Sequence, residues 1–284
     1  LLFLISTVMG IVNAYFPIER LRNYLSSHRL YGFQYLLASI FGAITPFCSC
    51  SSIPLFIGFV KGGIPLGVTF AFLITSPLVN EVAVAMFLGT FGWQVTVIYV
   101  ACGIVMGMVG GFVLGKLKLE RYLSPWIFQM QRMQMQADEA FEAEHTPFMK
   151  RLPSITKDAL GIVRGVILYI LLGIAIGAAI HGYVPEDFFA DFMQKAGLLG
   201  VPASVLIAVP MYANAAGIVP VVEVFVAKGI PLGTALAFMM SVVGLSLPEA
   251  TMLKKVMTWR LIGIFFGTVA FMIMILGWTF NQIL

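Results

Sequence analysis

The chain has 284 residues, of which 60% are hydrophobic and only 11% are charged, and its formal net charge is +4. A water-soluble domain of this length would have too little polar surface to cover itself, which leaves the membrane as its solvent. The cations sit at predicted helix ends rather than in one patch, which argues against nucleic-acid binding.

The apolar runs are long enough to be membrane helices. Residues 159–183 and 259–283 each reach the roughly 20 residues that a spanning helix needs, and the short alternating segments of spanning strands are absent from the sequence. The apolar start lacks a basic region and a cleavage site, which argues against a removable signal peptide. Leu1 is not a natural initiator, so we expect a truncated first helix.

Residues 30–61 predict a re-entrant helical hairpin. Turn-forming residues at Thr45–Pro54 interrupt the apolar run and leave arms of about 15 and 10 residues, too short for both to cross a core about 30 Å thick. We expect the tip near the membrane midplane. Ser51 or Ser52 is predicted as the N-cap of the second arm, with Pro54 in its first turn, so that an anion or thiolate is favoured there.

The predicted tip carries the most unusual polar cluster of the sequence, Cys48-Ser49-Cys50-Ser51-Ser52. Two thiols one residue apart can offer sulfur to a soft metalloid, and they are too close for an easy mutual disulfide. The alternative is that they pack as small hydrophobic residues between helices. Cys102, in a glycine-rich helix, is predicted to serve packing.

Residues 64–91 predict a spanning segment that is broken at Thr75–Pro77 and followed by Asn80 and Glu81. Irregular backbone survives at membrane depth only where it is buried in protein or lines an aqueous cavity. The next helix has small residues at helical spacing, which permits close helix contact. These are Gly103, Gly107, Gly110, Gly111 and Gly115.

The second half repeats the first after a hydrophilic linker. The predicted domains are a first membrane repeat at residues 1–115, a cytoplasmic linker at 116–158 and a second membrane repeat at 159–284. When the chain is aligned with itself so that Pro54 falls on Pro220, Pro54–Phe72 matches Pro220–Phe238 at ten of nineteen positions. This pairing is called the repeat alignment below. The duplication is expected to give two similar sets of helices.

The charges of equivalent loops differ in sign, and cytoplasmic loops retain Lys and Arg. One loop of the first half is basic and its partner is acidic, through Arg20, Arg22 and Arg29 against Glu186, Asp187 and Asp191. The reverse holds for the uncharged Thr90–Gln94 turn and its basic partner, which has Lys254, Lys255 and Arg260. An odd number of crossings per half satisfies these placements, which predicts inverted-topology repeats and hence a transporter or channel.

The second half supplies the matching interruptions. Its hairpin spans residues 196–227 with a tip at Tyr212–Gly217, where Asn214 occupies the position of Cys48, and its next segment breaks at Gly244–Glu249. Four matched breaks predict one hydrated cavity.

The apolar segments contain three acidic residues, Glu81, Glu223 and Glu249. A charge at the membrane centre costs roughly 2.5 to 3.5 kcal/mol. Glu81 and Glu249 follow breaks, where they could couple protonation to transport or tie the free amides of the broken helix.

Three segments carry a family resemblance. Pro46–Ser51, Ser76–Glu81 and Gly244–Glu249 resemble the YraQ-type predicted permease family, whose characterised relatives include the ArsP organoarsenical efflux permeases. The likeness covers nearly the whole chain, and it implies that Cys48 and Cys50 handle a trivalent arsenical.

The sequence thus predicts an all-α secondary permease in a bacterial or archaeal plasma membrane, with alternating access and a thiophilic cargo moving outward. The open alternatives are a small-anion transporter, a passive channel, and a membrane thiol oxidoreductase or sensor that uses the Cys pair. No constellation for an enzyme or a cofactor appears in the sequence. The expected partners are the small-molecule cargo and the lipid bilayer, with a homo-oligomer left open. The predicted substrate-binding residues are Cys48, Ser49, Cys50, Ser51, Ser52, Asn80, Glu81, Asn214, Ser246 and Glu249.

Overall fold

The computed structural model describes residues 32–44, 49–61, 63–125, 199–211, 215–254 and 256–283. Throughout these ranges the regular structure is helical, and the one β-type pairing is an isolated bridge between Leu123 and Met257. The all-α prediction is confirmed for this part of the chain. The long run at 159–183 and most of the linker lie outside the described residues.

The first half and the second half contain corresponding helices. Those of the first half are α3 (Phe33–Ile44), α4 (Ser49–Lys61), α5 (Leu66–Leu78), α6 (Glu81–Thr90), α7 (Gly92–Lys116) and the short 3-10 helix η2 (Leu119–Tyr122). Those of the second half are α11 (Gly200–Ala208), α12 (Ala215–Ala227), α13 (Leu232–Gly244), α14 (Leu247–Leu253) and α15 (Trp259–Ile283). Both α4 with α12 and α5 with α13 begin and end at positions that the repeat alignment pairs.

The repeated Gly-Ile-Pro-Leu-Gly motif forms the same turn in both halves. Gly63 and Gly229 have positive φ angles of 75° and 85°, which glycine adopts without strain. The following amide closes the end of the preceding helix, with Ile64 N donating to Phe59 O and Ile230 N to Phe225 O, both at 3.1 Å. Each proline then starts the next helix, so the motif fixes the same helix-to-helix corner twice.

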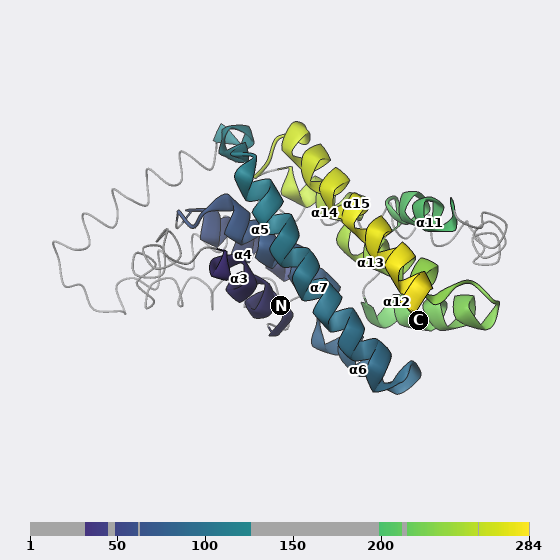
Figure 1. Ribbon diagram of the computed structural model, residues 1–284. Coiled ribbons are helices and arrows are strands. Elements are labelled where there is room, and N and C mark those ends of the chain that lie inside the picture. The colour runs from purple at the N-terminus through teal and green to yellow at the C-terminus, as the bar shows by residue number, and fades with distance from the viewer. Residues whose placement is uncertain are drawn as a thin grey trace, which may run out of the picture.

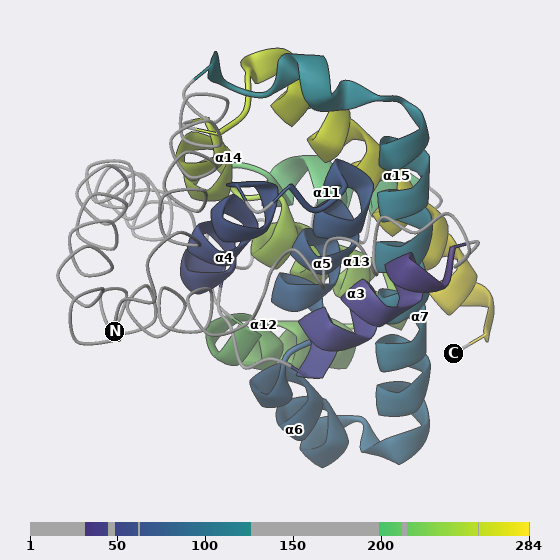
Figure 2. The same ribbon diagram turned by 90° about the vertical axis from the view of Figure 1, so that its left-hand side faces the viewer.

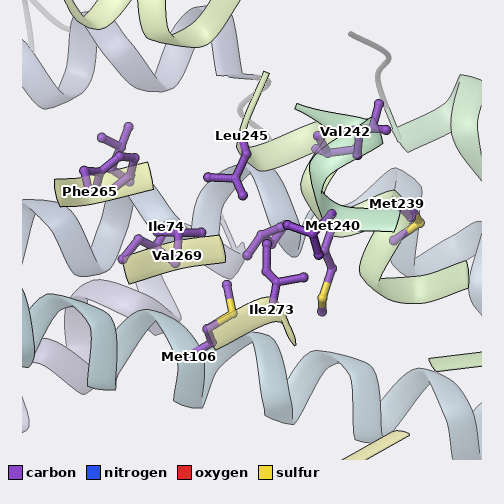
Figure 3. Close-up of a cluster of buried hydrophobic side chains, with 14 of the residues drawn as sticks. Ile74, Met106, Met239, Met240, Val242, Leu245, Phe265, Val269 and Ile273 are labelled. Atoms are coloured by element: carbon purple, nitrogen blue, oxygen red, sulfur yellow. The ribbon is translucent and has the colours of Figure 1, made fainter. Parts of the chain in front are cut away.

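Two apolar helices form the centre of the molecule. Every residue of α5 is buried, and α13 is buried from Gly233 to Gly244, as expected of helices that are hydrophobic on all sides. Figure 2 places α5 and α13 in the middle, with α4 and α14 on one side and α7 and α15 on the other. Figure 3 shows part of this core, where Ile74, Met106, Met240 and Ile273 come from α5, α7, α13 and α15.

The long helices α7 and α15 lie side by side and run antiparallel (Figure 1). The end of α7 is joined to the start of α15 by backbone hydrogen bonds, with Ser124 N donating to Val256 O at 2.8 Å and Thr258 N to Tyr122 O at 3.0 Å. On their outer faces both helices expose large apolar side chains, such as Val105 and Phe271. A soluble monomer rarely exposes a continuous apolar surface of this kind to water, whereas lipid chains can cover it.

Several helical stretches have the length and composition to cross a membrane. They are Gly92–Lys116, Leu232–Leu253, which comprises α13 and α14, and Trp259–Ile283, as predicted for residues 259–283. The pair α5 and α6, bent by 42°, supplies a fourth if it counts as one span. The chain is therefore a multi-pass membrane protein.

The glycine face of α7 packs against α5, as the small-residue spacing predicts. A Cβ atom added to Gly111 would lie 2.6 Å from the Cβ of Ala71, and one added to Gly107 would overlap the Oγ1 of Thr75. No side chain larger than hydrogen fits at these two positions without moving α5. Close backbone approach is what small residues provide between membrane helices.

Two of the predicted interruptions differ from the helix bounds in the structure. The interruption at Thr45–Pro54 is too long, because α4 already begins at Ser49. The break at Thr75–Pro77 is two residues early, because α5 continues to Leu78 with Pro77 inside it. A proline lacks the N–H that would bond to the residue four positions before it and its ring crowds that carbonyl, but it does not disturb the residues that follow it, so a helix can begin shortly before a proline or end just after one.

Candidate functional site

Two helix breaks meet at the centre of the molecule, one from each half. They are residues 79–80, between α5 and α6, and residues 245–246, between α13 and α14. Leu78 and Gly244, which the repeat alignment pairs, face each other, since a Cβ added to Gly244 would lie 3.2 Å from Leu78 Cδ2. The arm after each break packs against the other half, α6 on α12 and α14 on α4.

The first break is held by two side chains that satisfy its free backbone groups. Asn80 is the N-cap of α6, and its Oδ1 accepts a hydrogen bond from Ala83 N at 2.8 Å. The Tyr99 hydroxyl of α7 donates to the Leu78 carbonyl oxygen at 2.5 Å. Asn80 therefore uses its side-chain oxygen to cap the first turn of α6.

The second break is capped in the same way as the first. Ser246 is the N-cap of α14, and its Oγ accepts from Glu249 N at 3.4 Å. Leu247 N donates to Val209 O of the segment after α11 at 3.1 Å. Asn80 and Ser246 are equivalent in the repeat alignment and each caps the amide of the third residue on, so the two breaks are capped alike.

A serine pair joins α4 to α5, the helix that ends at the first break. The Oγ atoms of Ser52 on α4 and Ser76 on α5 lie 2.7 Å apart, and both side chains are fully buried. The predicted N-cap role of Ser51 or Ser52 is wrong, because both lie inside α4, which begins at Ser49. Helix α12 likewise begins at Ala215, inside the predicted tip Tyr212–Gly217.

The acidic residues have very different environments. Glu81 and Glu223 are exposed, whereas Glu249 is 1% exposed and its Oε2 has no hydrogen-bond partner among the described residues. Two buried hydroxyls in the same ranges also lack partners, Ser39 on α3 and Ser241 on α13. Buried polar groups are normally hydrogen-bonded, so each of these three groups is an exception that needs a physical explanation.

The sequence interpretation missed Ser76, Tyr99 and Ser241. Tyr99 could have been found as a polar tip in an apolar helix, which usually has a partner when it is buried. Ser241 is paired with Thr75 by the repeat alignment, so the predicted break at Thr75–Pro77 pointed to it as a polar residue at the equivalent place in the second half. Nothing in the sequence paired Ser52 with Ser76, because they lie on different helices.

Most side chains of the thiol cluster at Cys48–Ser52 lie outside what the structure describes. Cys48 and Asn214 are not among the described residues, nor are the side chains of Ser49, Cys50 and Ser51. Cys102 is half-buried on α7, in keeping with a packing role. Within the described ranges, no group of three or more His, Cys, Asp or Glu residues could hold a metal ion.

Positive charge gathers at the end of the molecule where α7 ends and α15 begins. The exposed cations there are Lys116, Lys118, Arg121, Lys254 and Arg260. Lys116 lies over the Phe112 ring at 4.6 Å, and Lys254 lies over the Trp259 ring at 4.8 Å. Aromatic rings with cations beside them are typical of the membrane interface.

A family described as predicted permease, ArsP_1, matches residues 1–282 of the chain. UPF0718 protein MJ0584 of Methanocaldococcus jannaschii is 20% identical over 302 residues, which cover 88% of this chain and 81% of that protein. UPF0718 protein YraQ of Escherichia coli is 24% identical over 221 residues, which cover 78% of this chain and 60% of that protein. No solved structure matches the chain.

Proposed function

The chain belongs to the ArsP_1 family of predicted permeases, and we propose that it is a secondary permease that moves a small solute through a mid-membrane cavity between two inverted repeats. The family and the apolar helices support a membrane transporter rather than an enzyme. The observation that supports a cavity between the two halves is the meeting of two matched helix breaks at Leu78 and Gly244.

The directions of equivalent helices support the inverted arrangement. The start of α5 lies against the end of α7, where a Cβ on Gly67 would lie 2.7 Å from Gly115 Cα. The start of α13 lies against the end of α15 in the same way, with Thr234 N donating to Asn281 Oδ1 at 3.1 Å. Because α7 and α15 are antiparallel, each pair of equivalents runs in opposite directions, the pattern of inverted-repeat transporters.

The charge distribution supports one orientation. The basic end of the molecule, with Lys116, Arg121 and Arg260, would face the cytoplasm, since cytoplasmic loops retain cations. The described turn at the other end of α7, Thr90–Gln94, carries no charge. In a bacterial or archaeal plasma membrane, the solute would then leave the cell through the face where α7 begins.

A thiophilic solute, with a trivalent organoarsenical first, is the cargo that the sequence favours. Cys48 and Cys50 directly precede or begin α4, and Ser52 of the same helix reaches the first broken helix through Ser76. In this proposal the two thiols bind the soft atom of the cargo, and the polar groups of the breaks hydrate the path. Asn214 would face them from the second hairpin.

A small anion is the second candidate cargo, and the N-terminus of α6 favours it. Helix N-termini offer amide N–H groups and a positive dipole end to anions. The α6 terminus, at Glu81, lies at the break that meets the other half. The Cys48 and Cys50 thiols would then have no role in binding.

Flux into proteoliposomes tests the proposal and the role of the two thiols. The full chain would be reconstituted beside the Cys48→Ser and Cys50→Ser variants, with Cys102→Ser as the matched control. We expect saturable uptake of a trivalent methylarsenical by the wild type and the control, and loss of uptake in both Cys variants.

Three other outcomes point elsewhere. Undiminished methylarsenical flux in the Cys48 and Cys50 variants would remove the thiol role. Flux that does not saturate would indicate a passive channel. Thiol turnover in detergent without accumulation in vesicles would indicate a membrane thiol oxidoreductase.

A further inference from the structure

The carboxyl of Glu249 is buried, and within the described ranges no hydrogen bond ties its Oε2 to the break where it lies. The backbone amide of Glu249 is already capped by the Ser246 hydroxyl. The repeat alignment pairs Glu249 with Ala83 of the first half, whose amide is capped by Asn80 in the same way. The first half thus builds the same break with a methyl group, which is 0% exposed.

Keeping a carboxyl at this position is costly. An unpaired carboxylate inside protein and membrane loses its hydration without compensation, whereas a neutral carboxylic acid loses much less. A scaffold would favour alanine here, as the first half has. Retention of the acid at such a cost is typical of a group that works through a change of charge.

The surroundings favour a proton over a metal cation as the ligand of this carboxyl. Helix α14 contains no other ionisable residue, and α4, which packs against it, has only Cys50 and Lys61, at its two ends. Helix α11, which directly precedes the Val209 carbonyl that accepts from Leu247 N, has none. The described residues contain no group of three or more metal-ligating side chains around Glu249, whereas a proton needs only the carboxyl itself.

We propose that Glu249 is the proton-coupling group of the permease, an inference that rests on the proposed transport function. In the arrangement seen, Glu249 is a neutral acid. When α14 moves away from α4 and water reaches the carboxyl, the O–H bond breaks, the proton passes to water and a carboxylate remains. The site must take up a proton again before it can close, which ties the movement of the halves to the proton gradient.

The test compares Glu249→Gln with Glu223→Gln in proteoliposomes of the full chain. Gln keeps the shape of the neutral acid but cannot release a proton, and exposed Glu223 on α12 is the matched control. With a trivalent methylarsenical as the probe, Glu249→Gln should lose accumulation driven by a pH gradient and keep exchange of the probe at equal concentrations. Glu223→Gln should keep both activities. Gradient-driven accumulation by Glu249→Gln at the wild-type level would overturn the proposal.

Infrared spectroscopy of the carboxyl group supplies a second readout that needs no cargo. The wild type at neutral pH should have a C=O stretching band of a protonated carboxyl, which is absent in Glu249→Gln and present in Glu223→Gln. If the wild type lacks the band, the proton-coupling proposal fails even where transport is intact. If the band is present but no probe moves, the cargo assignment fails and the protonated state of Glu249 stands.

Discussion

Removing the hydroxyl of Tyr99 should weaken the first helix break without disturbing the packing around it. Tyr99→Phe keeps the ring, which stacks on Phe87 with centroids 4.7 Å apart. It removes the hydrogen bond to the Leu78 carbonyl, whose residue is 2% exposed, so water cannot replace the donor. Leaving a buried polar group unpaired costs about 1 to 3 kcal/mol, while interhelical hydrogen bonds in membranes average about 0.6 and reach about 1.7. We therefore expect a loss of about 1 to 2 kcal/mol.

The measurement is the free energy of unfolding in mixed detergent micelles titrated with SDS, followed by tryptophan fluorescence. Tyr35→Phe is the matched control, since Tyr35 contacts Phe112 edge to face and its hydroxyl makes no hydrogen bond to the described residues. The control should unfold like the wild type. Equal losses for Tyr99→Phe and Tyr35→Phe would refute the conclusion that Tyr99 satisfies the carbonyl at the break.

Three further substitutions test the elements around the site by the same unfolding titration. Asn80→Ala removes the cap of α6 and should cost about 1 kcal/mol, most of which Asn80→Ser should restore; no loss would refute the capping role. Gly107→Ala should cost about 1 to 3 kcal/mol because its Cβ would lie 2.9 Å from Ser39 Oγ and overlap a second side chain, whereas Gly267→Ala meets nothing within 4 Å and should cost nothing. Equal stability of these two glycine variants would contradict the close α5–α7 packing. Asn281→Ala removes two 3.1 Å hydrogen bonds to Thr234 and should cost about 1 to 2 kcal/mol, and wild-type stability would contradict the anchoring of α13 to α15.

Much of the architecture follows from the sequence because composition and repetition are properties of the chain itself. Matching Pro54–Phe72 with Pro220–Phe238 identified corresponding helices, and the glycine spacing identified the packed face of α7. Both signals are local. They depend on neighbouring residues and on the physical demand that apolar helices be buried or face lipid.

The limits of sequence reasoning are clearest at the breaks. The residues Thr75 to Pro77 predict a break, yet Thr75 bonds back to Ala71 O and the helix ends only after Leu78. The partner of Ser52 lies 24 residues away, and that of the Leu78 carbonyl lies 21 residues away on α7. Such pairings depend on how helices pack, which no local pattern encodes.

The acidic residues illustrate the same limit. Glu81 and Glu249 both follow a break and looked equivalent in the sequence, but one is exposed and the other is 1% exposed. The repeat alignment distinguishes them, because it pairs Glu249 with Ala83 and Glu81 with Leu247. The roles of Cys48 and Asn214 remain predictions, since both lie outside the described residues.

Chemical cross-linking of the two predicted tips tests most directly whether the breaks and both tips face one hydrated cavity. The full chain would carry Asn214→Cys and native Cys48, with Cys50→Ser and Cys102→Ser, in proteoliposomes treated with a short bifunctional thiol reagent. We predict an intramolecular cross-link between residues 48 and 214. Labelling of both thiols by a membrane-impermeant reagent at the bilayer surface, without any cross-link, would contradict it.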